Sequence, residues 1–100
     1  MTRNEEVIIK TENVTVRVLS LPAGESIPWH FHKQVTGYMF CLAGDVGVLL
    51  RNPGKEIRLQ LGQRCEVPPL RVHRVANMGY KEATNLLVQG VGHYDFNIVG

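Results

Sequence analysis

Cysteine is scarce in this chain of 100 residues, which contains only Cys41 and Cys65. Two cysteines with this spacing form neither a disulfide scaffold nor a zinc ribbon, so we expect each to be a small, buried, apolar side chain. The first six residues lack the apolar segment of a secretory signal. These features together predict a cytoplasmic location, where thiols stay reduced.

Long apolar runs and an excess of charge of one sign are also missing. No segment approaches the roughly 20 consecutive apolar residues that a membrane-spanning helix needs. The net charge is only +2, and the arginines are spread along the chain among glutamates. A nucleic-acid-binding domain would show a clustered basic patch instead. We therefore expect no membrane span and no nucleic-acid partner.

The composition is that of one folded domain. Hydrophobic residues make up 44% of the chain and charged residues 20%, which is typical of a globular protein and not of a disordered segment. No low-complexity stretch or linker divides the sequence. We predict a single domain over residues 1–100.

Helical periodicity is absent over any useful length, and short runs rich in Val, Ile, Leu and aromatic residues alternate with Gly, Pro and Asn. Many short strands with turn residues between them indicate a β-sandwich or β-barrel. The predicted strands are Val7–Lys10, Val14–Leu21, Ile27–His32, Gly37–Leu42, Val46–Arg51, Glu56–Gln60, Arg64–Val67, Val72–Ala76, Thr84–Gly90 and His93–Val99.

Alternation along two of these strands indicates their faces. In Val14–Leu19 the valines lie on one face, and Thr15 and Arg17 lie on the other. In Gly37–Leu42 both faces are apolar, so this strand is expected to be buried on both sides, against a second sheet or a subunit partner. A homodimer is therefore expected. The face that carries Gly37, Met39 and Cys41 is expected to line an internal cavity.

The segment His30-Phe31-His32 places two histidines two residues apart. On a strand both imidazoles project from the same face, whereas on a helix they would diverge. Such a pair can occupy neighbouring positions around a metal ion, although histidines in strands are also often exposed or hydrogen-bonded core residues.

Glycines, histidines and a proline surround this pair with regular spacing. From Gly24, five residues lead to His30 and His32, four more lead to Gly37, and six more lead to Gly44. From Gly62, five residues lead to Pro68, and the same run then contains Leu70, His73 and Asn77. This order resembles the two motifs of the cupin superfamily, G-x5-H-x-H-x3-4-E-x6-G and G-x5-P-x-G-x2-H-x3-N.

The resemblance implies an all-β fold, an antiparallel jelly-roll β-barrel with a metal ion inside it. Carried over by position, His30, His32 and His73 match metal ligands of the family. Neutral imidazoles suit Fe, Ni, Zn, Cu or Mn. We therefore expect one divalent transition metal, and a small-molecule substrate or ligand.

Two positions depart from the motifs. Gly37 stands where the family has its metal-binding glutamate, and no acidic residue lies between Ser26 and Gly44. Leu70 stands in the glycine position of the second motif, where we expect only a turn to change. Without the carboxylate, preference should shift from hard ions toward Fe, Ni, Cu or Zn. Gln34 is a further candidate ligand through its amide oxygen, or else a polar turn residue.

The three-histidine set resembles the metal site of cupin dioxygenases that lack the glutamate. This favours an iron-dependent, dioxygenase-like enzyme acting on a small carbonyl or carboxylate compound. The alternative is a non-catalytic cupin that binds or senses a small ligand. An arginine could hold a substrate carboxylate, and Glu66 or His93 could act as an acid or base. The candidate arginines are Arg51, Arg58 and Arg71.

Overall fold

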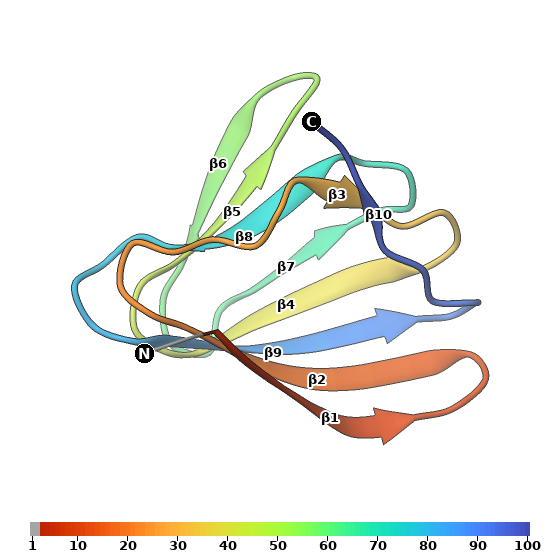
Figure 1. The fold of residues 1–100 in the computed structure, drawn as a ribbon, viewed down its shortest axis with the longest axis horizontal. Helices are drawn as coiled ribbons and strands as arrows, with labels where there is room; N and C mark the ends of the chain where they lie inside the picture. Colours follow the sequence, from red (N-terminus) through yellow and green to blue (C-terminus); the bar gives the residue numbers. More distant parts are fainter. Residues whose placement is uncertain (1–2) are drawn as a thin grey trace.

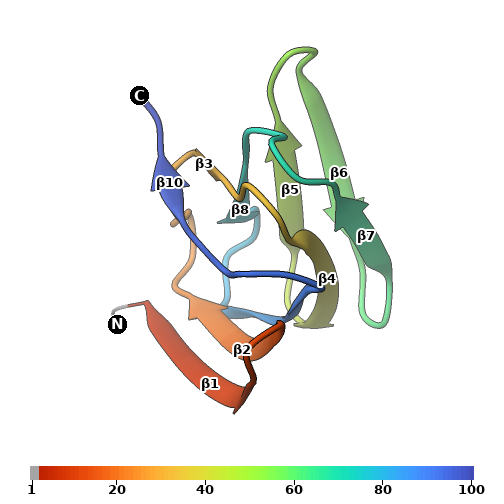
Figure 2. The same cartoon turned by 90° about the vertical axis from the view of Figure 1, so that its right-hand side faces the viewer.

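The computed structural model describes residues 3–100 and folds them into two five-stranded antiparallel sheets that face each other (Figures 1 and 2). This confirms the predicted all-β jelly roll. The strands are β1 (Asn4–Lys10), β2 (Val14–Leu21), β3 (His30–Phe31), β4 (Thr36–Ala43), β5 (Val46–Leu50), β6 (Lys55–Leu59), β7 (Arg64–Val67), β8 (His73–Asn77), β9 (Ala83–Gly90) and β10 (Asn97–Ile98).

The chain crosses repeatedly from one sheet to the other. The first sheet has the order β1-β2-β9-β4-β7, and the second has the order β10-β3-β8-β5-β6. Strands adjacent in sequence, such as β2 and β3 or β4 and β5, therefore lie in opposite sheets (Figure 1). This winding leaves a space between the sheets, and side chains from both of them fill it or line it. Within residues 3–100 no helix of the length and apolarity required to cross a membrane occurs.

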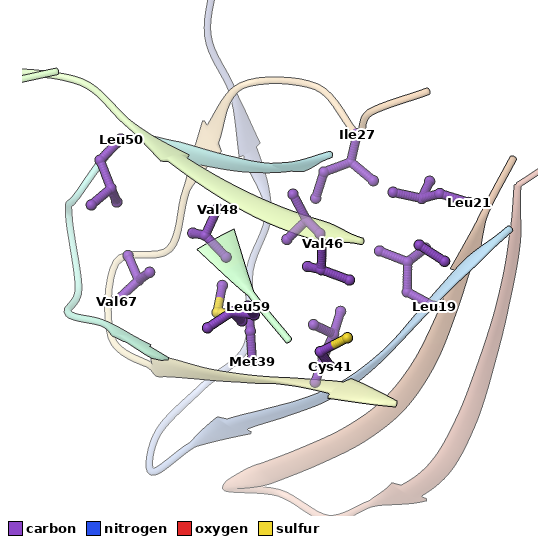
Figure 3. Close-up of a cluster of buried hydrophobic side chains, with 13 residues drawn as sticks. Leu19, Leu21, Ile27, Met39, Cys41, Val46, Val48, Leu50, Leu59 and Val67 are labelled. Carbon is purple, nitrogen blue, oxygen red and sulfur yellow. The ribbon is translucent and has the colours of Figure 1, made fainter. Parts of the chain in front are cut away.

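The hydrophobic core fills one part of the space between the sheets (Figure 3). The first sheet contributes Leu19, Leu21, Met39 and Cys41 among others, and the second contributes Val46, Val48 and Leu50 from β5. These side chains are nearly or completely buried. The removal of their apolar surface from water is the main force that holds the two sheets together.

Strand β2 turns its valines outward. Thr15 and Leu19 are buried, and the valines of the strand are only partly buried. Thr15 pairs with Gln89 of β9, and Arg17 pairs with Leu87, so these residues share the face that points between the sheets. The more polar face of β2 is therefore the interior one, which alternation alone did not decide.

Two predicted strands are much shorter in the structure, and Val46–Arg51 ends one residue early, at Leu50. Within Ile27–His32 only His30–Phe31 is a strand, because Pro28 lacks the N–H that would extend the ladder. Within His93–Val99 only Asn97–Ile98 is a strand. Trp29, which follows Pro28, is half-buried. It lies under the guanidinium groups of Arg51 and Arg74, at 4.1 and 4.7 Å from its ring centroid.

Four of the motif positions, Gly24, Gly44, Gly62 and Leu70, have a left-handed backbone. Gly44 has φ +80°, and a Cβ there would lie 2.7 Å from the carbonyl oxygen of Glu82, so only glycine fits. Leu70, which replaces the motif glycine, still adopts φ 69°. Its backbone N–H donates to the carbonyl oxygen of His32 at 2.7 Å. The turn is thus retained despite the substitution, at a cost of about 1–3 kcal/mol.

Candidate metal centre

Three histidines converge between the two sheets. His30 belongs to β3 and His73 to β8, and the two are directly paired in the sheet. His32 follows two residues after His30 and points in the same direction. The ring centroid of His30 lies 4.3 Å from that of His73 and 4.8 Å from that of His32. One ligand nitrogen from each residue lies within 4.8 Å of the other two. The structure thus brings together the three ligands predicted from the motifs.

Backbone carbonyls hold all three rings by their Nδ1 atoms. His30 Nδ1 donates to the carbonyl oxygen of Pro28 at 2.8 Å, and His73 Nδ1 donates to that of Arg71 at 2.7 Å. His32 Nδ1 donates to the carbonyl oxygen of Asp95. With the proton on Nδ1, each Nε2 keeps its lone pair, which is the arrangement that a metal-binding histidine needs.

The Nε2 atoms show that this site suits a cation. His32 and His73 are 3% and 1% exposed, and their Nε2 atoms are buried without a hydrogen-bond partner among the described residues. Buried polar atoms are almost always paired, so two unpaired acceptors side by side call for a missing partner. A transition-metal ion would satisfy them, and imidazole is a ligand that Fe, Ni, Cu and Zn accept.

Burial keeps the three imidazoles neutral. Desolvation lowers the pKa of His30 to about 3 and that of His73 to about 4, and it also lowers the pKa of His32. The carbonyl partners of Nδ1 oppose this effect without cancelling it. At neutral pH the lone pairs are therefore free to bind a metal, because no proton competes for them.

We expect the metal-free protein to lose stability as the pH falls from about 6.5 toward 4. In that range the unfolded chain binds protons at these histidines and the folded chain does not, so protonation favours unfolding. The measurement is the thermal midpoint of chelator-treated protein against pH. His30→Gln should flatten the dependence. His93→Gln, a change at an exposed histidine outside the cluster, is the matched control, and an equal effect of both changes would contradict this prediction.

The glutamate position of the motif holds a glycine, and the end of the Met39 side chain lies next to it. Gly37 lies buried on β4 and faces the interior with Met39. A Cβ built on Gly37 would lie 3.3 Å from the Met39 Cε atom, so the end of that side chain covers the glycine. The centre is therefore a three-histidine site that offers no carboxylate at this position.

A cavity of about 290 Å³ adjoins the histidines. His30 and His73 line it, with apolar side chains from both sheets that include Leu19, Met39 and Val75. Phe96 stacks on His30, with ring centroids 4.1 Å apart and an angle of 18° between the planes. Of the three residues expected to line the cavity, Met39 does so and also belongs to the hydrophobic core. Cys41 lies in the core only, and Gly37 is not among the lining residues.

The cavity also has a polar wall, formed by Arg17, Gln89 and Tyr94. Arg17 Nη1 donates to Tyr94 Oη at 2.7 Å and to Glu5 Oε1 at 3.1 Å. None of these residues was a sequence-based candidate. The one available signal was the placement of Arg17 on the face of its strand opposite the valines. Tyr94 and Phe96 come from the segment before β10, which the sequence assigned to a strand.

The predicted arginine and acid–base candidates lie elsewhere. Arg51 donates to the carbonyl oxygen of Gly100, and Arg71 donates to those of Asn52 and Pro53. Arg58 forms ion pairs with Asp45 and Glu56. Glu66 is exposed and pairs with Tyr38 on the outer face of its sheet. These residues do not line the cavity, because their side chains point out of the barrel or lie at its ends.

Gln34 and His93 lie beside each other at the surface. Both are exposed, and Gln34 Oε1 accepts a hydrogen bond from the backbone N–H of His93 at 3.1 Å. The amide oxygen that would bind a metal is therefore engaged in holding the loop before β10. Gln34 is therefore not part of the histidine cluster.

Both cysteines are free thiols. Cys41 is buried and Cys65 is half-buried. Burial raises the pKa of Cys41 and raises that of Cys65 to about 11, which disfavours the thiolate that a nucleophile requires. This agrees with the expected role of the cysteines as small packing residues.

Two facing antiparallel sheets that enclose a histidine cluster define a protein of the jelly-roll, double-stranded β-helix class. The chain belongs to the cupin family, because the model described as "Cupin domain" matches residues 17–89. No curated protein sequence matches the chain.

Solved structures share the fold. A protein with a double-stranded β-helix domain from Klebsiella pneumoniae is 20% identical, with a TM-score of 0.87 over 99% of this chain and 85% of its own. A polyketide cyclase from Streptomyces resistomycificus is 17% identical, with a TM-score of 0.82 over 98% and 71%. An oxalate oxidase in complex with the substrate analogue glycolate is 16% identical, with a TM-score of 0.85 over 97% and 55%. At these identities the likeness concerns the fold alone.

Proposed function

We propose that this cupin binds one divalent transition metal through His30, His32 and His73 and acts with it on a small molecule as an iron-dependent, dioxygenase-like enzyme. The observation that carries the proposal is the convergence of three buried imidazoles whose Nδ1 atoms are held by carbonyl oxygens. Iron, when bound, would supply the redox chemistry that oxygen activation requires.

The residues around the centre would prepare it for a substrate. The carbonyl partners keep each imidazole in one tautomer and one orientation. Apolar side chains such as Leu19 and Val75 line the adjoining cavity, and this apolar lining strengthens electrostatic contacts inside it. Phe96 covers one face of His30 and lies 38% exposed, at the boundary between cavity and solvent.

The test is the metal content of protein purified without a histidine tag or chelator, followed by oxygen consumption with candidate small molecules. We expect near one equivalent of metal per chain, and iron if the dioxygenase proposal holds. Zinc or nickel at one equivalent would keep the site and contradict the oxygen chemistry. Protein that holds no metal even after reconstitution would contradict the proposal as a whole.

The second candidate function is a cupin that binds or senses a small ligand without catalysis. One observation favours it: of the described acidic side chains, only Glu5 lines the cavity, and it is already paired with Arg17. Among the described residues, the cavity therefore offers no unpaired carboxylate that could act as a general base. Binding of a ligand with no turnover in the loaded protein would support this candidate over the first.

We also propose that the protein is a homodimer in the cytoplasm. The outer face of the first sheet supports the dimer, because Val16 pairs with Val88 and Val18 pairs with Leu86, forming an apolar, partly exposed surface. Sedimentation should give twice the mass of the 11.2 kDa chain, and Val88→Asp should give monomers. A wild-type protein that sediments as a monomer would contradict the dimer.

The two free thiols agree with the proposed location in a reducing compartment, which fractionation of cells would test.

A further inference from the structure

We propose that the cavity binds a small hydroxy- or amino-carboxylate, with Arg17 holding the carboxylate and Gln89 accepting a hydrogen bond from the hydroxyl or amino group. This rests on the proposed function, whose substrate class it names. Both residues are on the interior face of the first sheet, on the neighbouring strands β2 and β9. Both line the cavity that His30 and His73 also line.

One edge of the Arg17 guanidinium is unused. Nη1 is occupied by Glu5 and Tyr94, and the Cζ atom lies 3.9 Å from the centroid of the Tyr94 ring, which fixes the plane of the group. Nε is buried without a partner, and no described residue accepts a hydrogen bond from Nη2. Nε and Nη2 form the edge that binds a carboxylate through two parallel hydrogen bonds.

Gln89 provides the second unpartnered group. It is 5% exposed, and its Oε1 atom is buried with no hydrogen-bond partner in residues 3–100. It lies on β9 directly opposite Gly37, beside the position where the motif glutamate would stand. Because a buried amide oxygen without a donor is costly, a ligand with a hydroxyl or amino group is favoured over one that only accepts.

The charge of the cavity selects an anion. Among the residues that the structure describes, Arg3, Glu5 and Arg17 are its charged lining residues, so one positive charge is in excess. Glu5 neutralises Arg17 only in part, because the carboxylate is 34% exposed and contacts Nη1 alone. A divalent ion on three neutral imidazoles would add two further positive charges. The volume of about 290 Å³ lies at the lower limit of ligand pockets, which limits the ligand to a small acid.

The experiment is calorimetric titration of the full chain with three hydroxy acids, namely lactate, 2-hydroxy-4-methylpentanoate and mandelate. Each is compared with its primary amide and with the acid that lacks the hydroxyl. At least one hydroxy acid should bind about tenfold or more tightly than its amide, as expected for a charge-assisted, two-bond contact. If no acid exceeds its amide by more than about twofold, the proposal is wrong.

Substitutions at Arg17 and Gln89 test which residue causes the preference for carboxylate and which causes the preference for the hydroxyl group. Arg17→Met should abolish the preference for carboxylate over amide, and Arg17→Lys, which keeps the charge but not the edge, should retain only part of it. Arg51→Met is the matched control, because that guanidinium lies over Trp29 outside the cavity. An unchanged preference in Arg17→Met would overturn the role of Arg17. If Arg17→Met does not fold, the comparison of Arg17→Lys with Arg51→Met tests the role of Arg17 instead.

Gln89→Leu should lose the preference for the hydroxy acid over the acid without the hydroxyl, while keeping the preference for carboxylate. This comparison is made on chelator-treated protein, where no metal can hold the hydroxyl. A retained hydroxyl preference would overturn the role of Gln89. Metal content is measured on the untreated samples. Absence of metal together with a normal preference for carboxylate over amide would refute the proposed function alone. One equivalent of metal together with no preference for carboxylate would refute this inference alone.

Discussion

Replacement of His73 with alanine is expected to weaken metal binding by at least about a hundredfold, because even groups that only support a ligand are worth 10–100-fold. His73 is 1% exposed and supplies one of the three converging nitrogens. His30→Ala and His32→Ala should have effects of the same order. The measurement is metal content by mass spectrometry after equilibration with a competing chelator.

Two controls separate loss of a ligand from loss of the fold. His93→Ala removes an exposed histidine and should keep full metal. The buried variants should remain folded by circular dichroism, although removal of His73 leaves the Arg71 carbonyl without its donor at a cost of about 1–3 kcal/mol. Full metal in all three buried variants would show that the site is elsewhere.

Introduction of glutamate at position 37 is expected to tighten the binding of Mn²⁺ by about tenfold or more, since a carboxylate ligand adds the negative charge that hard ions favour. Gly37 faces the interior of the barrel, and its φ lies outside the left-handed region, so an L side chain is allowed there. The Met39 Cε atom, 3.3 Å from the new Cβ, must move, and it can because it is the end of a flexible side chain.

Gly37→Gln is the matched control, with the same shape and no charge. It should tighten Mn²⁺ binding far less than Gly37→Glu, and both variants should lose about 1–3 kcal/mol of stability to crowding. Equal affinity for Mn²⁺ in both variants and in the wild type would mean that Met39 blocks the position or that the carboxylate points away from the histidines. Isothermal titration of chelator-treated protein gives the three affinities.

Local pattern was enough for most strands. Val14–Leu21 and Arg64–Val67 begin and end as predicted, because turn residues bound an apolar, valine-rich run in the first and alternating charged and apolar residues in the second. The prediction failed where tertiary contacts replaced strand pairing. The segment His93–Val99 pairs only over Asn97–Ile98. Its earlier residues supply Tyr94 and Phe96 to the cavity.

The three candidate ligands were also readable from the sequence. His30 and His32 share a face because of the two-residue repeat of a strand. His73 was assigned by its motif, and the reason it reaches the site is its direct pairing with His30 across the second sheet. That pairing is long-range, and residue spacing alone does not contain it.

The sequence by itself determined an all-β fold, its strands and the three histidines, because strand periodicity and motif spacing are local properties of the chain. Only the tertiary structure decided that Arg17 faces the cavity. The sequence suggested Arg51, Arg58 or Arg71, yet the pairing of β2 with β9 puts Arg17 on the interior face that also carries Gln89. Alternation divides a strand into two faces, and only the packing of one sheet on the other makes one of them the inside.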